Sequence, residues 1–144
     1  MQVPQRVLDA IAEHARRESP RECCGLLLGT VDRIVEAVAT RNSAADPVRR
    51  YEVSPAEYFA EITRCRALGA QGEQSLSVIG AYHSHPRSAP VPSPTDVQEA
   101  FEGFLFLIAG PVEGPDPLSI QGYHLKNGDL QPVPLVPEGL TAPR

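Results

Sequence analysis

The stretch Leu76-Ser77-Val78-Ile79-Gly80-Ala81-Tyr82-His83-Ser84-His85-Pro86 decides how the fold is interpreted. Its apolar first part predicts a buried strand, and the two histidines stand at the end of that strand. Because alternate side chains of a strand point to the same side, His83 and His85 should direct their imidazoles at one point, with Ser84 facing away. Such a pair of imidazoles is able to bind a metal ion, but a His-x-His on a strand is by itself common without one.

A carboxylate follows these histidines after a short loop. Ser93-Pro94-Thr95-Asp96 comes after a proline-rich loop over residues 86–92, and it predicts a short helix, to about Gly103, that Ser93 caps. A zinc ion suits two neutral imidazoles and one carboxylate, with water as the fourth ligand. We therefore predict that His83, His85 and Asp96 bind one zinc ion.

Glu22 and Ser93 are the candidates for the other groups that a hydrolytic zinc site needs. Zinc lowers the pKa of a bound water to about 7, so hydroxide is available at neutral pH. Glu22 stands at the start of a strand expected in the same sheet, and it is the candidate base that takes the water proton and returns it to a leaving amine. The Ser93 hydroxyl is the candidate donor to the oxyanion of a tetrahedral intermediate.

The spacing of these residues resembles the signature of the JAMM metalloproteases, the catalytically competent branch of the MPN-domain family. The matching pattern is His83-x-His85, seven residues, Ser93, two residues and Asp96, and Glu22-Cys23-Cys24-Gly25-Leu26 resembles the family's glutamate before a glycine-containing strand. The similarity covers roughly residues 5–135. It implies an α/β fold similar to that of cytidine deaminases, with a mixed central β-sheet flanked by helices.

The resemblance also implies a role for each site residue. Zinc would be bound by His83, His85 and Asp96, with a zinc-bound water as nucleophile. Glu22 would be the general acid/base, and Ser93 would help to polarise the scissile carbonyl.

The family further implies a substrate class. Its members cleave peptide or isopeptide bonds after the C-terminal glycine of ubiquitin or ubiquitin-like proteins, and compact bacterial members resemble enzymes that process sulfur-carrier proteins. This chain is compact, and after Asp96 it has one further histidine, His124, and no cysteine for a second zinc site. We expect a zinc metallopeptidase or isopeptidase that binds the extended tail of such a protein, beside an exposed sheet edge.

Two other functions stay open. Some MPN domains are non-catalytic scaffolds or binding modules, but these typically have the metal ligands replaced. A small-molecule amide hydrolase would use the same zinc chemistry. A zinc deaminase is excluded, because that class needs a His-x-Glu and a Pro-Cys-x-x-Cys pattern and the sequence has neither.

The composition is that of one ordinary globular domain. Hydrophobic residues make up 42% of the chain and charged residues 22%, which is usual for a single packed core. The net charge of −5 argues against a nucleic-acid partner. Three cysteines suggest no disulfide framework, and neither a signal pattern nor a membrane-length apolar stretch is present, so we expect a cytoplasmic protein without a membrane partner. The oligomeric state stays open, a homodimer included.

Periodicity and turn signals predict the scaffold. Helices are expected over about residues 4–18 and from Ser54-Pro55-Ala56-Glu57, a capping box, to a C-terminal cap at Gly69. Strands are expected over residues 23–29, 34–40, 76–82, 104–108, 118–125 and 130–135. Asn127-Gly128 predicts a hairpin between the last two, and Pro132 and Pro134 make the final strand an edge. We expect one domain over residues 1–136 and a flexible tail over 137–144.

Several other reactive side chains are interpreted as structural. Cys23, Cys24 and Cys65 should be buried as small hydrophobic residues. Tyr82 should pack on the face opposite to His83, His124 should be structural, and His14 should face solvent on the first helix.

Overall fold

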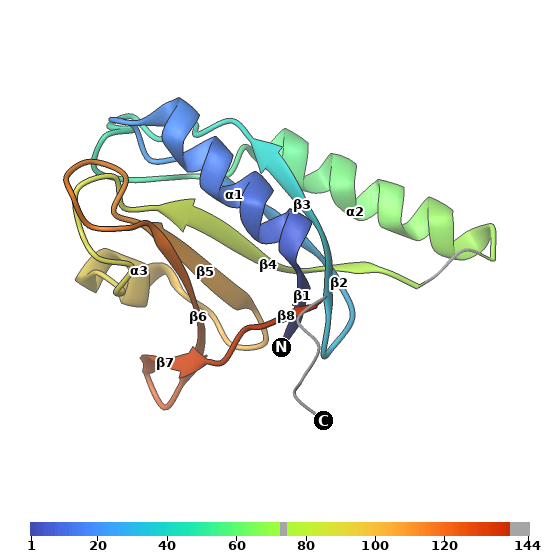
Figure 1. Ribbon diagram of the computed structural model, residues 1–144. Helices are drawn as coiled ribbons and strands as arrows, with labels where there is room; N and C mark the ends of the chain where they lie inside the picture. The colour runs from blue at the N-terminus through green and yellow to red at the C-terminus, as the bar shows by residue number, and fades with distance from the viewer. Residues whose placement is uncertain (73–74, 139–144) are drawn as a thin grey trace, which may run out of the picture.

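The computed structural model describes residues 1–72 and 75–138, and their centre is a mixed sheet with the strand order β3-β2-β4-β5-β6-β7 (Figure 1). The strands are β2 (Cys24–Gly29), β3 (Ile34–Thr40), β4 (Ser77–Ser84), β5 (Leu105–Gly110), β6 (Ser119–Lys126) and β7 (Asp129–Val133). In this sheet β4 and β5 are parallel, and the other neighbouring pairs are antiparallel. A parallel pair needs a crossover connection, and the one between β4 and β5 carries the predicted short helix.

Helices cover both faces of this sheet. The helix α1 (Gln5–Glu18) packs its apolar stripe on one face, where it meets Leu27 and Tyr82. The helices α2 (Pro55–Ala70) and α3 (Pro94–Glu99) contribute to a second apolar cluster, around Ala81. Since side chains alternate along β4, Tyr82 faces α1, and His83, two residues after Ala81, shares its side with α2 and α3.

The predicted hairpin and edge strand are confirmed. Asn127 and Gly128 both have positive φ, at 53° and 78°, as the turn of a tight two-residue hairpin requires. β7 is an edge strand of the described sheet. Its Pro132, which has no N–H, therefore interrupts no hydrogen bonds between two internal strands.

The predicted start of α2 is confirmed, with Ser54 at the N-cap and Pro55 in the first turn, but the predicted capping box and two helix ends are wrong. The Ser54 side chain makes no capping bond, and the Glu57 carboxylate accepts a hydrogen bond from the Arg41 N–H (2.7 Å). The helix also continues through Gly69 to Ala70. α3 ends at Glu99, before the predicted Gly103, since the next residue is extended (ψ 154°).

The predicted flexible tail is wrong for its first two residues. β8 (Val136–Glu138) pairs in parallel with β1 (Gln2–Pro4), and Arg33 holds Glu138 by an ion pair of 2.7 Å. Residues 139–144 lie outside the described residues. Among the helices that the structure describes, none has both the length and the apolar character to cross a membrane.

His14 does not face solvent. It is buried between α1 and β4, and its Nδ1 forms a 2.7 Å hydrogen bond with the Tyr82 hydroxyl. The spacing explains the error, because His14 follows Val7 and Ile11 on the same apolar stripe. Burial lowers the pKa of His14. Tyr82 is buried as predicted, and its ring lies so close over Gly25 that a Cβ there would clash with it.

Candidate metal centre

The two histidines are held on a rigid backbone. His83 pairs with Cys24 of β2 on one side and with Ile108 of β5 on the other, so β4 runs two residues beyond its predicted end. His85 follows β4, and its N–H donates to the Ala109 carbonyl (2.8 Å). Both imidazoles therefore project from main chain that neighbouring strands fix, on the side predicted from alternation.

Asp96 is fixed by the helix cap that the sequence predicted. The Asp96 N–H donates to Ser93 Oγ (3.0 Å), and the Ser93 N–H donates to Asp96 Oδ2 (2.8 Å). These reciprocal bonds are the capping box of α3. The carboxylate is thereby presented from the first turn of α3 towards the end of β4.

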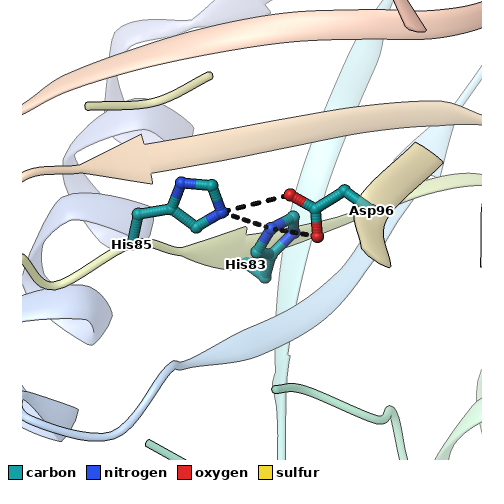
Figure 2. A group of neighbouring side chains, drawn as sticks. All are labelled: His83, His85 and Asp96. Carbon is teal, nitrogen blue, oxygen red and sulfur yellow. Dashed lines mark hydrogen bonds and ion pairs between the residues drawn. The ribbon is translucent and has the colours of Figure 1, made fainter. Parts of the chain in front are cut away.

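His83, His85 and Asp96 converge on one point (Figure 2). His83 Nε2 lies 3.2 Å from His85 Nε2 and 3.2 Å from Asp96 Oδ1, and His85 Nε2 lies 3.1 Å from Asp96 Oδ2. Tetrahedral zinc, with bonds of about 2.0–2.2 Å to such ligands, has ligand atoms roughly 3.3 Å apart. The three donors thus fit a zinc ion and leave a fourth position for water.

The tautomer of His85 also suits a cation. Its Nδ1 donates to the Ala89 carbonyl (3.0 Å), so in the neutral ring Nε2 carries the lone pair. That lone pair faces a carboxylate, and two electron-rich groups at 3.1 Å need a proton or a metal ion between them. A partner on the outer nitrogen is the usual way of orienting a metal-binding histidine.

Without a metal ion, a proton on His85 balances the negative charge of Asp96. Burial lowers the pKa of His85, but its hydrogen bonds to Asp96 and Ala89 outweigh burial and raise it above the ordinary value. Burial raises the pKa of Asp96, but the bonds from the two histidines hold it well below its usual range. Complete burial lowers the pKa of His83, whose Nδ1 has no hydrogen-bond partner among the described residues. His83 is therefore set to remain neutral, the form in which an imidazole can bind a metal ion.

Glu22 lies beside His85 and Asp96, two of the three predicted ligands. It is buried, with 8% of its surface exposed, and it lines a cavity of about 190 Å³ together with His85, Ser93 and Asp96. Burial raises the pKa of Glu22 to about 7. A carboxyl that titrates near neutral pH is suited to both accept and donate a proton. The Ser93 hydroxyl accepts the capping bond and donates to no described residue, so its proton is free for a ligand in the cavity.

Sequence reasoning missed Asn42, which organises the loop beside Glu22. Its Nδ2 donates to the carbonyls of Glu22 (2.9 Å) and Arg50 (2.9 Å), and its Oδ1 accepts from the N–H groups of Ala44 (3.0 Å) and Glu52 (3.1 Å). One side chain thus joins the main chain of the candidate base to both ends of this loop. The partners are main-chain groups of an irregular segment, so no residue pattern reveals them.

Tyr51, at the end of that loop, was also missed. Its ring stacks on His83, with ring centroids 4.2 Å apart and planes inclined by 13°. Stacking covers the face of a ligand that has few other restraints, and Tyr51 also lines the cavity with Glu22. An aromatic residue in a short extended piece gives no sequence signal for this position.

The cysteines pack as predicted. All three are free and buried. Burial raises the pKa of Cys23 to about 12 and that of Cys24 to about 11, so neither is a thiolate near neutral pH. Thiol chemistry is therefore not suggested beside Glu22. His124 is exposed on β6, paired in register with Leu105, and takes no part in the metal centre.

Known proteins share this architecture. A family model described as prokaryotic homologs of the JAB domain matches residues 4–121. A solution structure of a protein from Desulfitobacterium hafniense matches 95% of this chain and 92% of its own, with a TM-score of 0.80 and 22% identity. A JAB1/MPN domain protein from Archaeoglobus fulgidus matches 94% of this chain and 99% of its own, with a TM-score of 0.57 and 21% identity. The predicted α/β fold of the MPN type is confirmed.

Curated relatives are similar over most of the chain. A desampylase from Haloferax volcanii is 37% identical over 72% of this chain and 75% of that protein. A "Probable TtuB-protein conjugate cleaving protease" from Thermus thermophilus is 32% identical over 68% of this chain and 62% of that protein. A CysO-cysteine peptidase from Mycobacterium tuberculosis is 27% identical over 90% and 85%. The chain therefore belongs to the family of prokaryotic homologs of the JAB domain.

Proposed function

We propose that this protein is a zinc-dependent peptidase or isopeptidase that cleaves the amide bond at the C-terminal tail of a ubiquitin-like or sulfur-carrier protein. One observation carries the proposal: the ligand atoms of His83, His85 and Asp96 lie within 4.8 Å of one another, and Glu22 lines the same cavity. A non-catalytic scaffold would not need a buried carboxyl there. Relatives named for cleaving TtuB and CysO conjugates support the substrate class.

The proposed mechanism assigns one task to each residue of the cavity. When bound, zinc activates a water molecule and polarises the carbonyl of the substrate. Glu22 takes the proton of that water and delivers it to the leaving nitrogen, which its buried, near-neutral carboxyl favours. Ser93 donates its hydroxyl proton to the developing oxyanion, a contact of a kind worth about 2.7–4 kcal/mol. Tyr51 and Ala89 hold the histidine rings in place.

The cavity indicates how a substrate tail would reach the site. Its lining comes from α3 and from the loops that carry Tyr51 and Ser88, and none of it comes from the edge strands β3 and β7. We therefore propose that the tail runs between these loops, in place of the strand addition at a sheet edge that we expected from sequence. The narrow cavity favours small residues such as glycine at the tail.

A cytoplasmic location and the absence of a nucleic-acid partner are part of the same proposal. Three free, buried cysteines support a reducing compartment. The net charge of −5 opposes binding to a phosphate backbone. A homodimer stays open and is measurable by sedimentation.

The test uses purified protein loaded with zinc, with CysO or TtuB carrying a C-terminal extension as substrate. Mass spectrometry should show cleavage directly after the carrier's C-terminal glycine. Glu22→Gln and His85→Ala should each lower kcat/KM by about 100-fold or more, whereas Glu13→Gln, an exposed carboxyl on α1, should have no effect. Undiminished cleavage by both site variants, or none by the zinc-loaded wild type on either carrier, would sink the proposal.

A further inference from the structure

The described sheet ends in two edge strands, and they differ in how they are protected. Prolines and charged side chains, lysine above all, are the usual means by which an edge strand avoids pairing with another chain. β7 carries Pro132. β3 forms the opposite edge (Figure 1), and its sequence, Ile-Val-Glu-Ala-Val-Ala-Thr, contains neither proline nor lysine. β3 is therefore the edge at which another chain can pair.

Hydrogen bonds between β2 and β4 show which main-chain groups of β3 point outwards. The Cys23 N–H donates to Ser84 Oγ (2.8 Å) and its C=O accepts from the Ser84 N–H (3.1 Å), so both groups turn towards β4. Main-chain groups of successive strand residues point to opposite sides, so the first residue of β2 turns towards β3, where it pairs with Thr40. By the same alternation, Ala39 and Ala37 turn their N–H and C=O groups away from the sheet.

Side chains occupy this outer edge at both of its ends. The Val35 C=O accepts a hydrogen bond from Arg6 of α1 (3.1 Å), and the Arg41 N–H donates to Glu57 of α2 (2.7 Å). Between them, the outward groups of the two alanines have no hydrogen-bond partner among the described residues. We call residues 37–39 the open edge.

The occupied groups select one register for pairing with a second copy of the chain. A two-fold axis through Val38 places Ala37 opposite Ala39 of the second copy, so each unpaired N–H meets an unpaired C=O. The same axis places Val35 opposite Arg41 of the second copy, and both are already bonded within their own chains. An axis through Ala37 would instead place Ala39 opposite Val35, whose C=O is occupied.

The side chains of β3 fit the same register. Val38 is half-buried and would lie directly opposite its own counterpart, which gives an apolar contact at the axis. Glu36, the one charged residue of β3, bonds Arg64 (3.1 Å) and would face Thr40 of the second copy, so like charges do not meet. The two alanines carry only methyl groups, which lets the main chains approach closely.

We propose that the open edge pairs with the open edge of a second copy, so that the two sheets join across a two-fold axis at Val38. The homodimer is isologous, because the same residues lie on both sides of the interface. An edge this short gives a small interface, so the dimer should dissociate on dilution. No residue of the metal centre takes part, so the dimer is independent of the proposed function.

Sedimentation equilibrium tests both the dimer and its surface. Wild type should shift from one chain to two as the concentration rises. Ala39→Pro removes an outward N–H that bonds to no described residue, so the variant should fold and stay monomeric. Val38→Glu places two carboxylates opposite each other at the axis and should weaken the dimer about 10-fold or more.

Val31→Glu is the matched control for the added charge. Val31 lies in the turn between β2 and β3 and is 94% exposed. The same substitution there should leave the dissociation constant of the dimer unchanged. Circular dichroism checks that each variant is folded, and if Ala39→Pro is not, Val38→Glu and the cross-link described next decide the outcome.

A cysteine at the axis tests the register. Val38→Cys should form an intermolecular disulfide with oxidised glutathione, because the two Cα atoms would lie about 4.5 Å apart. Ala39→Cys would lie opposite Ala37 rather than opposite itself and should cross-link far less. The three native cysteines are buried, and wild type treated in the same way measures their background.

Each further outcome counts against the second copy at this edge. Wild type that stays a single chain up to millimolar concentration would overturn the proposal. A dimer that survives both Ala39→Pro and Val38→Glu, or equal cross-linking at residues 38 and 39, would overturn this surface and register. A monomeric wild type that binds an extended peptide along β3 would assign the open edge to another partner. Cleavage at the metal centre is measured separately, so none of these results decides the proposed function.

Discussion

Glu22 is placed where its charged form is least favourable. It is buried next to a carboxylate, Asp96, and its main chain is tied to Asn42 and Pro47 so that the side chain stays in the cavity. A group kept in this environment costs stability in its ionised state. The same burial gives it a pKa suited to proton transfer.

Replacing Glu22 by glutamine should therefore stabilise the metal-free protein near pH 8. Burial raises the folded-state pKa from 4.5 to about 7, so the folded state holds its proton more tightly than the unfolded state does. The stability that protonated Glu22 contributes to the folded state is fully present below about pH 4.5 and is lost as the pH rises through 7. The shift alone corresponds to roughly 3 kcal/mol, and solvent screening reduces the expected gain to about 1–2 kcal/mol.

Urea unfolding in the presence of a chelator measures this effect. The free energy of unfolding of Glu22→Gln should exceed that of wild type near pH 8 and match it near pH 4. A difference that does not change with pH would contradict the burial argument.

The buried pair of His14 and Tyr82 gives a second prediction. Tyr82→Phe removes the hydroxyl that bonds His14 Nδ1 and leaves a buried polar atom without a partner. A loss of about 1–3 kcal/mol in unfolding free energy is expected. Tyr58→Phe is the matched control, because the Tyr58 hydroxyl bonds to no described residue, and it should cost less. Equal losses for the two variants would show that the pair does not contribute.

Among single residues, the sequence pattern predicted the positions of those whose spacing follows strand alternation or a helix turn. His83 and His85 follow strand alternation, and Asp96 follows the helix cap. Asn42 and Tyr51 act through main-chain bonds and ring stacking from an irregular loop, which no periodicity encodes. The burial of His14 could have been predicted from the apolar stripe that begins at Val7, but a polar side chain suggested an exposed position.

Among the elements, the loop between β3 and α2 is held by the hydrogen bonds of one side chain, Asn42. Asn42→Ala leaves the carbonyls of Glu22 and Arg50 and the N–H of Glu52 without their shared partner. We expect kcat/KM to fall about 10-fold or more, by the size of effect seen for residues that orient a site. Zinc content should be unchanged, because the predicted ligands stand at the end of β4, directly after it, and on α3.

Ser43→Ala is the control for this loop. The Ser43 hydroxyl makes one exposed bond, to the Glu52 carbonyl (3.1 Å), and its loss should change kcat/KM little. The interpretation fails if Asn42→Ala loses zinc in proportion to activity, or if the two variants behave alike.

Most elements of the fold followed from local pattern, and the exceptions have physical reasons. β3 lies at the predicted residues, 34–40, because its apolar run is bounded by clear turn signals. β1 and β8 were not predicted, since strands of three residues with a proline in each carry almost no pattern. α2 and α3 differ at their ends, where tertiary bonds such as Glu57 to Arg41 decide the boundary.

Across the whole molecule, the metal centre joins segments that are distant in sequence. The predicted ligands connect the end of β4 with α3, and Glu22 and the loop of Asn42 lie on the side of β2. A metal bound only by the folded chain stabilises it by mass action.

Zinc should therefore raise the stability of the whole domain. At a free zinc concentration 100 times the dissociation constant, the expected gain is about 2.7 kcal/mol. The Tm measured by calorimetry should rise with zinc in wild type and not in Asp96→Asn. Magnesium, which prefers oxygen ligands in octahedral geometry, is the control ion and should not reproduce the rise.

The most direct test of the account is a zinc titration of the metal-free protein, with bound metal and cleavage of CysO carrying a C-terminal extension measured in the same samples. The account predicts that wild-type activity rises linearly and saturates at one zinc per chain. Glu22→Gln should bind the same single zinc and stay inactive. Cleavage without zinc, or activity in zinc-loaded Glu22→Gln equal to that of wild type, would contradict it.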